Sequence, residues 1–483
     1  MQPLHIILLI LTYFGVLILI SFFTGKSANN QTFFKANNSS PWYLVTFGMI
    51  GASLSGVTFI SVPGWVETKQ MSYIQMNLGF FVGYSVIALV LFPLYYKLNL
   101  TSIYTYLKER FGNYSYKTGA SFFLLSRTIG ASLRLFLVAK VLQSILFDAY
   151  NIPFWVTVTI TILLIWLYTF KGGIKTIVWT DTLQTLFMLI AVGVCIVMIK
   201  DALHIDSLIS YVSENKLSKM FFFEDVSAGN YFWKQFLSGV FIAIAMTGLD
   251  QDMMQKNLSC RNLKDAQKNM FWFSIALVVV NFFFLALGIL LTDYAVANGI
   301  DAHKDNLFSS IAMSGSLGLA TSLFFLLGLI AAAYSSADSA LTSLTTSFSI
   351  DILEIDKKDS EEEKTRIRKK IHIIFSILLA VVIVLFKHFI GDNSSVVSDL
   401  FTFAGYTYGP LLGLYAFGLF TNFDVKDKLV PIICLITPFL TYFISRISKA
   451  KFGFDFSFVI LLVNGLLTFL GLCTVINSKK RKQ

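Results

Sequence analysis

The amino-acid sequence predicts an all-α membrane protein with about thirteen transmembrane helices, and two observations carry this prediction. Only 14% of the 483 residues are charged and 55% are hydrophobic, whereas a soluble chain of average composition carries about 25% charged residues. Apolar runs of about 20 residues, the length that crosses the hydrocarbon core of a bilayer, recur along the whole chain. This composition disfavours the alternative of a large soluble enzyme with an apolar core.

The apolar runs give the expected helices in order. They lie at residues 5–24, 42–65, 75–98, 118–148, 152–170, 176–199, 234–256, 270–293, 317–350, 371–390, 397–421, 429–447 and 455–476. No stretch between them is long and polar enough to form a separate soluble domain. We therefore expect a single transmembrane domain over residues 1–483, embedded in a lipid bilayer.

Lysine and arginine gather in alternate linkers, and this pattern sets the expected orientation. Residues 97–117, 256–268 and 357–370 are rich in both residue types, and cytoplasmic loops are the ones enriched in them. We therefore expect a cytoplasmic C-terminus and, because the number of spans is odd, an N-terminus outside. The basic loop at residues 446–451 does not fit this alternation.

The sequence contains no pattern typical of a zinc site, an enzyme or a nucleic-acid-binding protein. The cysteines at 195, 260, 434 and 473 stand far apart, and the five histidines have no metal-ligand spacing. We therefore expect neither a zinc site nor an enzyme. The basic linkers account for the net charge of +10, so no nucleic-acid partner is expected.

A cluster of small and polar residues interrupts the second apolar segment at Gly51-Ala52-Ser53-Leu54-Ser55-Gly56. Two glycines and two serines at mid-membrane favour an unwound stretch. Irregular backbone at that depth is tolerated only where it is buried or lines a cavity, and its freed carbonyl oxygens can coordinate a small cation. Close helix packing through small residues is the alternative.

A second interruption lies five segments later, at Thr247-Gly248-Leu249-Asp250-Gln251-Asp252. Two broken helices at corresponding places in two halves of a chain are typical of inverted-repeat transporters. The repeats would then occupy about residues 42–199 and 234–421, with peripheral helices at 5–24, 429–447 and 455–476. A helix cap at the cytoplasmic interface is the alternative role for the two aspartates.

Hydroxyl side chains gather on one face of the ninth segment. Ala332, Ser335, Ser336, Ser339, Ser343 and Thr346 recur at spacings of three and four residues, which places them on one side of a helix. Hydroxyl oxygens suit a hard cation such as sodium, by analogy with calcium and magnesium. A polar zipper between two helices is the alternative.

An ionisable residue inside an apolar segment needs a partner, and Asp181, Arg127 and Arg134 are three such residues. Asp181 follows the start of the sixth segment, and Arg127 and Arg134 lie seven residues apart on one face of the fourth. The guanidinium of Arg134, near the centre of its segment, suits a carboxylate. A salt bridge within the protein is the alternative for the arginines, and a place at headgroup level is the alternative for Asp181.

Four motifs give the chain a resemblance to a known family. The stretches WTDTLQ, LDQDMMQKNLSCRNLKDAQ, AAAYSSADSALTS and GYTYGPLLG resemble those of the bacterial sodium/solute symporter family, which includes the sodium/galactose, proline and sialic acid symporters. The resemblance covers nearly the whole chain. It implies a leucine-transporter-type fold, a 5+5 inverted repeat, in the bacterial inner (plasma) membrane. It also implies import of a small organic solute driven by the sodium gradient.

The resemblance further implies the ligands of the coupling ion. The family's main sodium site uses two carbonyls of the first broken helix, together with an alanine carbonyl and two serine hydroxyls of the eighth core helix. The matching residues here are Gly51, Leu54, Ala332, Ser335 and Ser336.

Some members hold a second sodium ion beside the aspartate of the WTD motif. The matching residues here are Asp181, Asp338 and Ser339, and Asp338 stands where sodium/sialic acid relatives have serine. We expect a second cation at this place, with a proton or an unrelated salt bridge as the alternatives.

The substrate site, carried over by motif position, falls on Ser53, Ser55, Thr58, Tyr73, Asn77 and Arg134. The sialic acid transporter resembles this chain in having an arginine at the last position, where the galactose transporter has a neutral residue. The aromatic gate of sugar transporters is Met246 here. We therefore expect an organic anion such as sialic acid or another acidic sugar or carboxylate.

Two other functions stay open at this point. One is a sodium symporter for a neutral sugar or polyol, and the other is a solute-sensing membrane protein on the same scaffold. The sequence does not determine the oligomeric state, for which a monomer is the simplest expectation.

Overall fold

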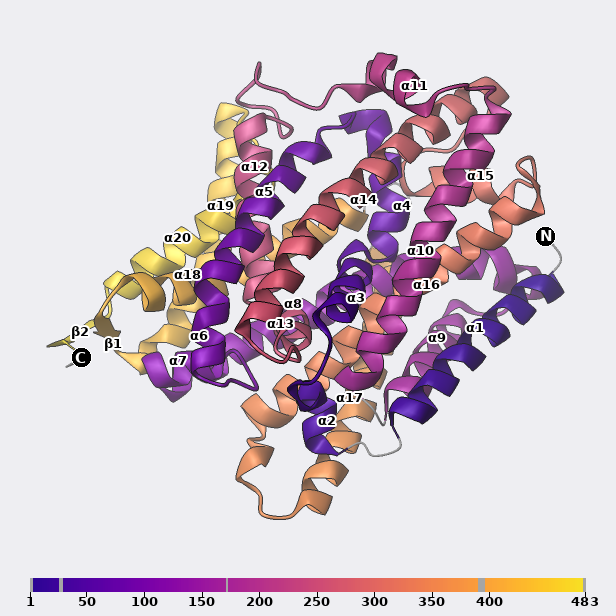
Figure 1. Cartoon of the computed structure of the whole chain (residues 1–483). Coiled ribbons are helices and arrows are strands. Elements are labelled where there is room, and N and C mark those ends of the chain that lie inside the picture. The colour runs from indigo at the N-terminus through magenta and orange to yellow at the C-terminus, as the bar shows by residue number, and fades with distance from the viewer. Residues whose placement is uncertain (1–2, 26–28, 171–172, 390–395, 481–483) are drawn as a thin grey trace.

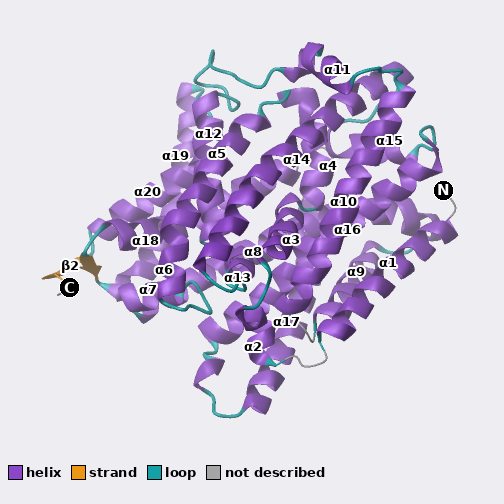
Figure 2. Cartoon of the chain, viewed as in Figure 1, coloured by secondary structure: helices purple, strands orange, loops and turns teal. Residues whose placement is uncertain are grey.

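The structure, a computed structural model, describes residues 3–25, 29–170, 173–389 and 396–480. Figure 2 shows that nearly all of the described chain is helical, which confirms the predicted all-α class. The longer helices are α1 (Pro3–Thr24), α5 (Tyr73–Val86), α8 (Asn113–Leu142), α9 (Phe154–Thr169), α10 (Ile174–Ala202), α12 (Phe232–Ala243), α14 (Leu263–Asn298), α16 (Gly318–Ser347), α17 (Glu361–Phe389), α18 (Val396–Phe420), α19 (Val430–Phe452) and α20 (Ile460–Cys473).

The remaining α-helices of the described chain comprise α3 (Trp42–Leu54) and α4 (Gly56–Lys69), which are of similar length to α5, and six helices of at most seven residues. These six are α2 (Asn30–Lys35), α6 (Phe92–Lys97), α7 (Thr105–Arg110), α11 (Leu208–Glu214), α13 (Gln251–Asn257) and α15 (Leu307–Met313). Two strands, β1 (Phe423–Val425) and β2 (Ile476–Lys480), pair antiparallel near the C-terminus. In Figure 1, α1 and α9 lie at one side of the bundle and α18 to α20 at the other, while α11 lies at one end and α2 lies toward the opposite end.

The helices coincide with the predicted apolar segments. Within the described ranges, eight helices are long and apolar enough to cross a bilayer, and two bent pairs raise the number to ten. The predicted segments 152–170, 397–421 and 455–476 also form helices, namely α9, α18 and α20. The number of thirteen crossings and the division into two repeats stay predictions.

The first bent pair is the interruption predicted in the second segment. The helices α3 and α4 meet at an angle of 56°, and the residue between them, Ser55, has φ 12° and ψ 168°, outside the helical region. A Cβ on Gly56 would lie 2.6 Å from Val138 and 3.5 Å from the Cα of Ala333. The break is therefore buried against α8 and α16, as irregular backbone at membrane depth requires.

The second bent pair is the predicted interruption at residues 247–252. The helices α12 and α13 meet at 71°. The carbonyls that the bend frees accept hydrogen bonds from two tyrosines: Tyr95 donates to the carbonyl of Gly248 at 2.9 Å and Tyr104 to that of Leu249 at 3.0 Å. The side chain of Asp250 caps α13 by accepting from the backbone N–H of residues 252 and 253. These polar backbone groups at the bend thus find hydrogen-bond partners within the protein.

The polar face of the ninth segment lies at the centre of the bundle. It belongs to α16, in which every residue from 328 to 347 is buried. The neighbours of α16 include α10, α8, α17 and both halves of the first bent pair. The hydroxyl groups of this helix therefore face other helices of the protein instead of lipid.

Candidate functional site

A cavity of about 80 Å³, here called the site cavity, lies beside the first bend. Its walls come from α3, α4, α5, α8, α12, α13, α14 and α18. Five of the six residues predicted to bind substrate line it: Ser53, Ser55, Thr58, Tyr73 and Arg134. The sixth, Asn77, lies behind the wall, where it accepts a hydrogen bond of 2.8 Å from Asn281, which does line the cavity.

The two arginines of α8 both line the site cavity but differ in their partners. Arg127 forms an ion pair with Asp252 and lies 4.0 Å from Asp250, so the salt-bridge alternative describes this residue. Arg134, which is 8% exposed, donates only to the hydroxyl of Ser336, at 3.3 Å, among the described residues. Its Nε atom is buried without a partner there.

The residues predicted for the main sodium site come together where α3 meets α16. A Cβ added to Gly51 would lie 3.2 Å from the Oγ of Ser335, so the backbone of α3 approaches the hydroxyl face of α16 directly. Leu54 lines the site cavity, and Ala332, Ser335 and Ser336 are buried on α16. Carbonyl and hydroxyl oxygens of this kind fit a hard cation.

The predicted second cation site contains a buried ion pair. Lys256 of α13 places its Nζ atom 2.6 Å from Oδ2 of Asp181 on α10, and both side chains are at most 1% exposed. The hydroxyl of Ser335 donates to the other oxygen of Asp181 at 2.7 Å, and that of Ser339 approaches Oδ2 at 3.5 Å. Asp181 is therefore buried in the interior of the bundle.

Asp338 lies in the same region with donors of its own. Its Oδ2 accepts from the hydroxyl of Tyr168 at 2.9 Å, and its Oδ1 accepts from the backbone N–H of Ser339 at 2.5 Å. The carboxylate is completely buried. The structure thus brings Asp181, Asp338 and Ser339 together, as the motif predicts.

An aromatic layer separates the site cavity from a second cavity of about 350 Å³, here called the vestibule. Tyr73 lines both cavities. Phe401 lines the site cavity, and its ring centroid lies 5.2 Å from that of Phe458. Phe458 and Trp65 line the vestibule. A site for a drug-sized ligand occupies about 300–1,000 Å³, so these rings must move before an organic solute can enter the site cavity.

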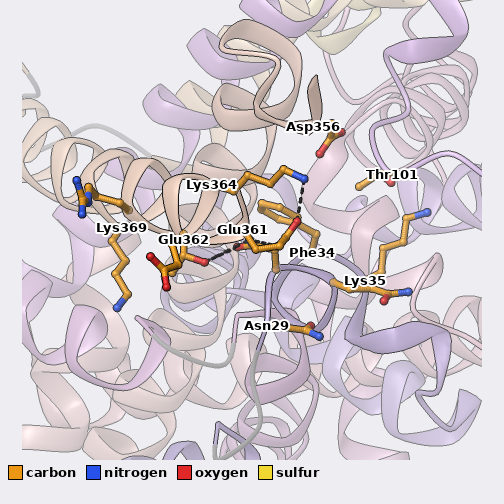
Figure 3. A pocket seen from close by; sticks show the side chains of 13 residues that line it. Asn29, Phe34, Lys35, Thr101, Asp356, Glu361, Glu362, Lys364 and Lys369 are labelled. Carbon is orange, nitrogen blue, oxygen red and sulfur yellow. Dashed lines mark hydrogen bonds and ion pairs between the residues drawn. The ribbon is translucent and has the colours of Figure 1, made fainter. Parts of the chain in front are cut away.

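A larger cavity, of about 950 Å³, lies elsewhere, between α2 and the start of α17. Figure 3 shows charged side chains around it, including Lys364 next to Glu361. Asn30 of α2 donates to Glu361 at 2.9 Å and thereby ties α2 to α17. None of the residues predicted to bind substrate or sodium lines this cavity.

Sequence reasoning missed two residues of the site region. Lys256 was assigned with the basic linkers, whereas the structure buries it against Asp181. The sequence did carry a signal for this burial: Lys256 follows the second break within the same short polar stretch, QDMMQKN. Asn281 of α14 gave no signal, because a single asparagine in a long apolar segment is also a common packing residue.

Comparison with known proteins gives a consistent result. The family model described as "Sodium:solute symporter family" matches residues 33–422. The sodium/sialic acid symporter NanT of Aliivibrio fischeri is 26% identical over 85% of this chain and 82% of its own length. The sodium/sialic acid symporter SiaT of Proteus mirabilis is 25% identical over 92% of this chain and 89% of its own length. These relatives are transporters and not enzymes.

A solved structure has the same fold. It is the substrate-bound outward-open state of a Na⁺-coupled sialic acid symporter, described as revealing a novel Na⁺-site. It superposes with a TM-score of 0.81 at 19% identity and covers 98% of this chain and 99% of its own. The leucine-transporter-type fold predicted from the motifs is thereby confirmed.

Proposed function

Because the chain belongs to the sodium:solute symporter family, in which sodium is the coupling ion, we propose that it imports a small organic anion together with sodium. The class of solute we propose is sialic acid or another acidic sugar or carboxylate. Both sodium/sialic acid symporters named above support this choice of class. The feature of this chain that carries the proposal is the guanidinium of Arg134.

A buried guanidinium needs an anionic partner, because removing a charge from water is costly unless it is paired. Arg127 has its partners in Asp252 and Asp250. Arg134 forms no ion pair with a described carboxylate and lines the site cavity. A carboxylate on the solute supplies the missing charge, and the planar fork of arginine suits bidentate recognition of that group.

Polar groups beside Arg134 suit the hydroxyl groups of a sugar acid. Ser53, Ser55 and Thr58 line the site cavity. Asn281 also lines it, and its Oδ1 atom is buried without a described partner. These groups would serve a neutral sugar equally well, so only Arg134 favours the anion over the alternative of a neutral sugar or polyol.

The contact between Arg134 and Ser336 suggests how the ion and the solute are coupled. Ser336 is a ligand of the proposed main sodium site, with Gly51, Leu54, Ala332 and Ser335. A sodium ion there repels the guanidinium that donates to Ser336 and leaves it free for the carboxylate of the solute. Sodium and solute would then raise each other's affinity by the same factor.

The placement in the membrane belongs to the same proposal. We place the chain in the bacterial inner membrane as a monomer, with the N-terminus outside, the C-terminus in the cytoplasm and no nucleic-acid partner. The basic linkers at 97–117, 256–268 and 357–370 support this orientation. The basic stretch at 446–451, which does not fit this alternation, forms the end of α19, and its Lys449 lines the vestibule in an ion pair with Asp455.

Uptake into proteoliposomes tests the proposal. The purified chain is reconstituted with an inward sodium or potassium gradient, and sialic acid, a second acidic sugar, a monocarboxylate, galactose and a polyol are offered in turn. We expect sodium-dependent uptake of an acidic solute. Arg134→Gln should abolish that uptake while sodium still raises the thermal stability of the protein, and Arg134→Lys should retain part of it. Uptake of galactose instead, or undiminished anion uptake by Arg134→Gln, refutes the choice of an anion.

A further inference from the structure

We propose that the ammonium group of Lys256 takes the place of the second cation predicted beside Asp181, so that the transport cycle uses a single sodium ion. The inference rests on the proposed function, because it concerns the same transport cycle. It replaces a diffusible ion by a side chain that stays attached to α13.

The geometry of Asp181 carries the inference. Its Oδ2 atom lies 2.6 Å from Nζ of Lys256, and its Oδ1 atom accepts from Ser335 at 2.7 Å. The oxygens of the carboxylate that a sodium ion would use therefore face an ammonium and a hydroxyl donor. Ser339, another predicted ligand, turns its hydroxyl toward the same Oδ2 atom at 3.5 Å.

The surroundings leave no room for the pair to separate into water. Lys256 is 1% exposed and Asp181 is not exposed at all. A Cβ on Gly48 of α3 would lie 3.1 Å from the Cβ of Asp181, so α3 closes one side of the pair. A sodium ion entering here would meet the ammonium at short range in a low-dielectric interior, where like charges repel strongly.

Asp338 lies close enough to Lys256 for their charges to interact, but its direct partners are other groups. Its two oxygens accept from Tyr168 and from the backbone of Ser339, and no ion pair joins it to Lys256 in the described part of the chain. Replacing Lys256 alone would therefore leave Asp181 without a cation, which is the condition under which a second sodium ion would bind.

The single remaining sodium ion binds at the proposed main sodium site. Ser335 lies between the two places, since it donates to Asp181 and also faces Gly51. The ammonium of Lys256 thus holds the Asp181 carboxylate that positions one ligand of the proposed main site. With one sodium ion and one monovalent anion moved in each cycle, transport is electroneutral.

Counting bound ²²Na⁺ on the purified, full-length protein tests the inference without any organic solute. The wild-type chain should bind one sodium ion at saturation, with a Hill coefficient near one in sodium-dependent thermal stabilisation. Lys256→Gln removes the ammonium and should bind two ions with a Hill coefficient above one. Lys256→Arg keeps the charge and should stay at one ion.

Two further variants separate this role from a purely structural one. Asp181→Asn combined with Lys256→Gln removes both partners of the pair and should return the number of bound ions to one. Lys234→Met is the matched control: Lys234 is 6% exposed and donates to the carbonyls of Ser227 and Asp455, so its loss removes a buried ammonium without changing the sodium count.

The outcomes distinguish this inference from the proposed function. Two sodium ions on the wild-type chain, or a folded Lys256→Gln variant that still binds one, overturns the inference. If Lys256→Gln does not fold, the wild-type count and the uptake of a monovalent anion at different imposed membrane potentials decide the question, because electroneutral uptake does not respond to the potential. The expected sodium counts without uptake of any acidic solute support the role of Lys256 and refute the proposed substrate class.

Discussion

Replacing Gly51 with alanine perturbs the point at which α3 meets α10 and α16. A Cβ at this position would lie 2.2 Å from the Oγ1 atom of Thr185 and 3.2 Å from the Oγ atom of Ser335, whereas ordinary contact begins at 3.4 Å. Thr185 cannot simply turn away, because its hydroxyl donates to the carbonyls of Phe47 at 2.8 Å and of Asp181 at 2.7 Å. The added methyl group therefore has to push α3 away from its neighbours.

The size of the effect follows from overpacking. Inserting a methyl group into a well-packed interior costs about 1–3 kcal/mol. If this cost falls on the conformation that binds sodium, the apparent affinity for sodium drops about 5- to 150-fold, since about 1.4 kcal/mol corresponds to a factor of ten. We expect the cost to fall on sodium binding in particular, because the added methyl group contacts Ser335 and both Gly51 and Ser335 are proposed sodium ligands.

Sodium-dependent thermal stabilisation of the purified protein measures the effect. Gly51→Ala should raise the sodium concentration that gives half of the maximal stabilisation. The double variant Gly51→Ala, Thr185→Ala should behave within about threefold of Thr185→Ala alone, because the obstructing hydroxyl is gone. Gly193→Ala is the control. Gly193 lies on the same helix as Thr185, and a Cβ added there has no neighbouring atom within 4 Å. A Gly51→Ala variant with wild-type sodium dependence, or a double variant as weak as Gly51→Ala, refutes the close approach.

Three further predictions follow from contacts at and around the site. Ser336→Ala removes a proposed ligand and should weaken the sodium activation of uptake about tenfold, the effect of losing one interaction of this strength, in an initial-rate assay at varied sodium. Phe458→Ala should open the aromatic layer between the vestibule and the site cavity, so that a thiol reagent reacts faster with a cysteine placed at Ser53. The hydrogen bond with Glu67 raises the pKa of His303, so its contribution to stability is present below the ordinary pKa of about 6.5 and is lost as the pH rises through the raised pKa. The melting temperature of His303→Gln should therefore change less between about pH 6 and pH 9 than that of the wild type.

Each of these has a result that contradicts it. Unchanged sodium activation in the Ser336 variant excludes that hydroxyl as a ligand. Equal labelling rates with and without Phe458 show that the ring does not control access. A melting temperature that falls equally with pH in both proteins shows that the contact between His303 and Glu67, with Nδ1 and Oε1 2.6 Å apart, adds nothing to stability, as exposed pairs often do.

The helices and both interruptions were predictable from the sequence because they depend on local chemistry. A run of about 20 apolar residues has to be a helix in a bilayer, since every backbone group must be satisfied within its own segment. Glycines and serines at residues 51–56, and one glycine among polar residues at 247–252, break that rule locally, and the bends lie at both places. The hydroxyl face of α16 likewise follows from spacing alone.

The partners of the charged residues were decided only by the tertiary structure. Asp181 and Lys256 are 75 residues apart and Arg127 and Asp252 are 125 apart, and no spacing rule connects positions on different helices. Arg127 and Arg134 share one face of α8, yet among the residues that the structure describes only Arg127 forms an ion pair with a carboxylate. Which charge is paired depends on how the helices pack and rotate against one another, and that packing leaves Arg134 facing the site cavity while it places Lys256 on Asp181.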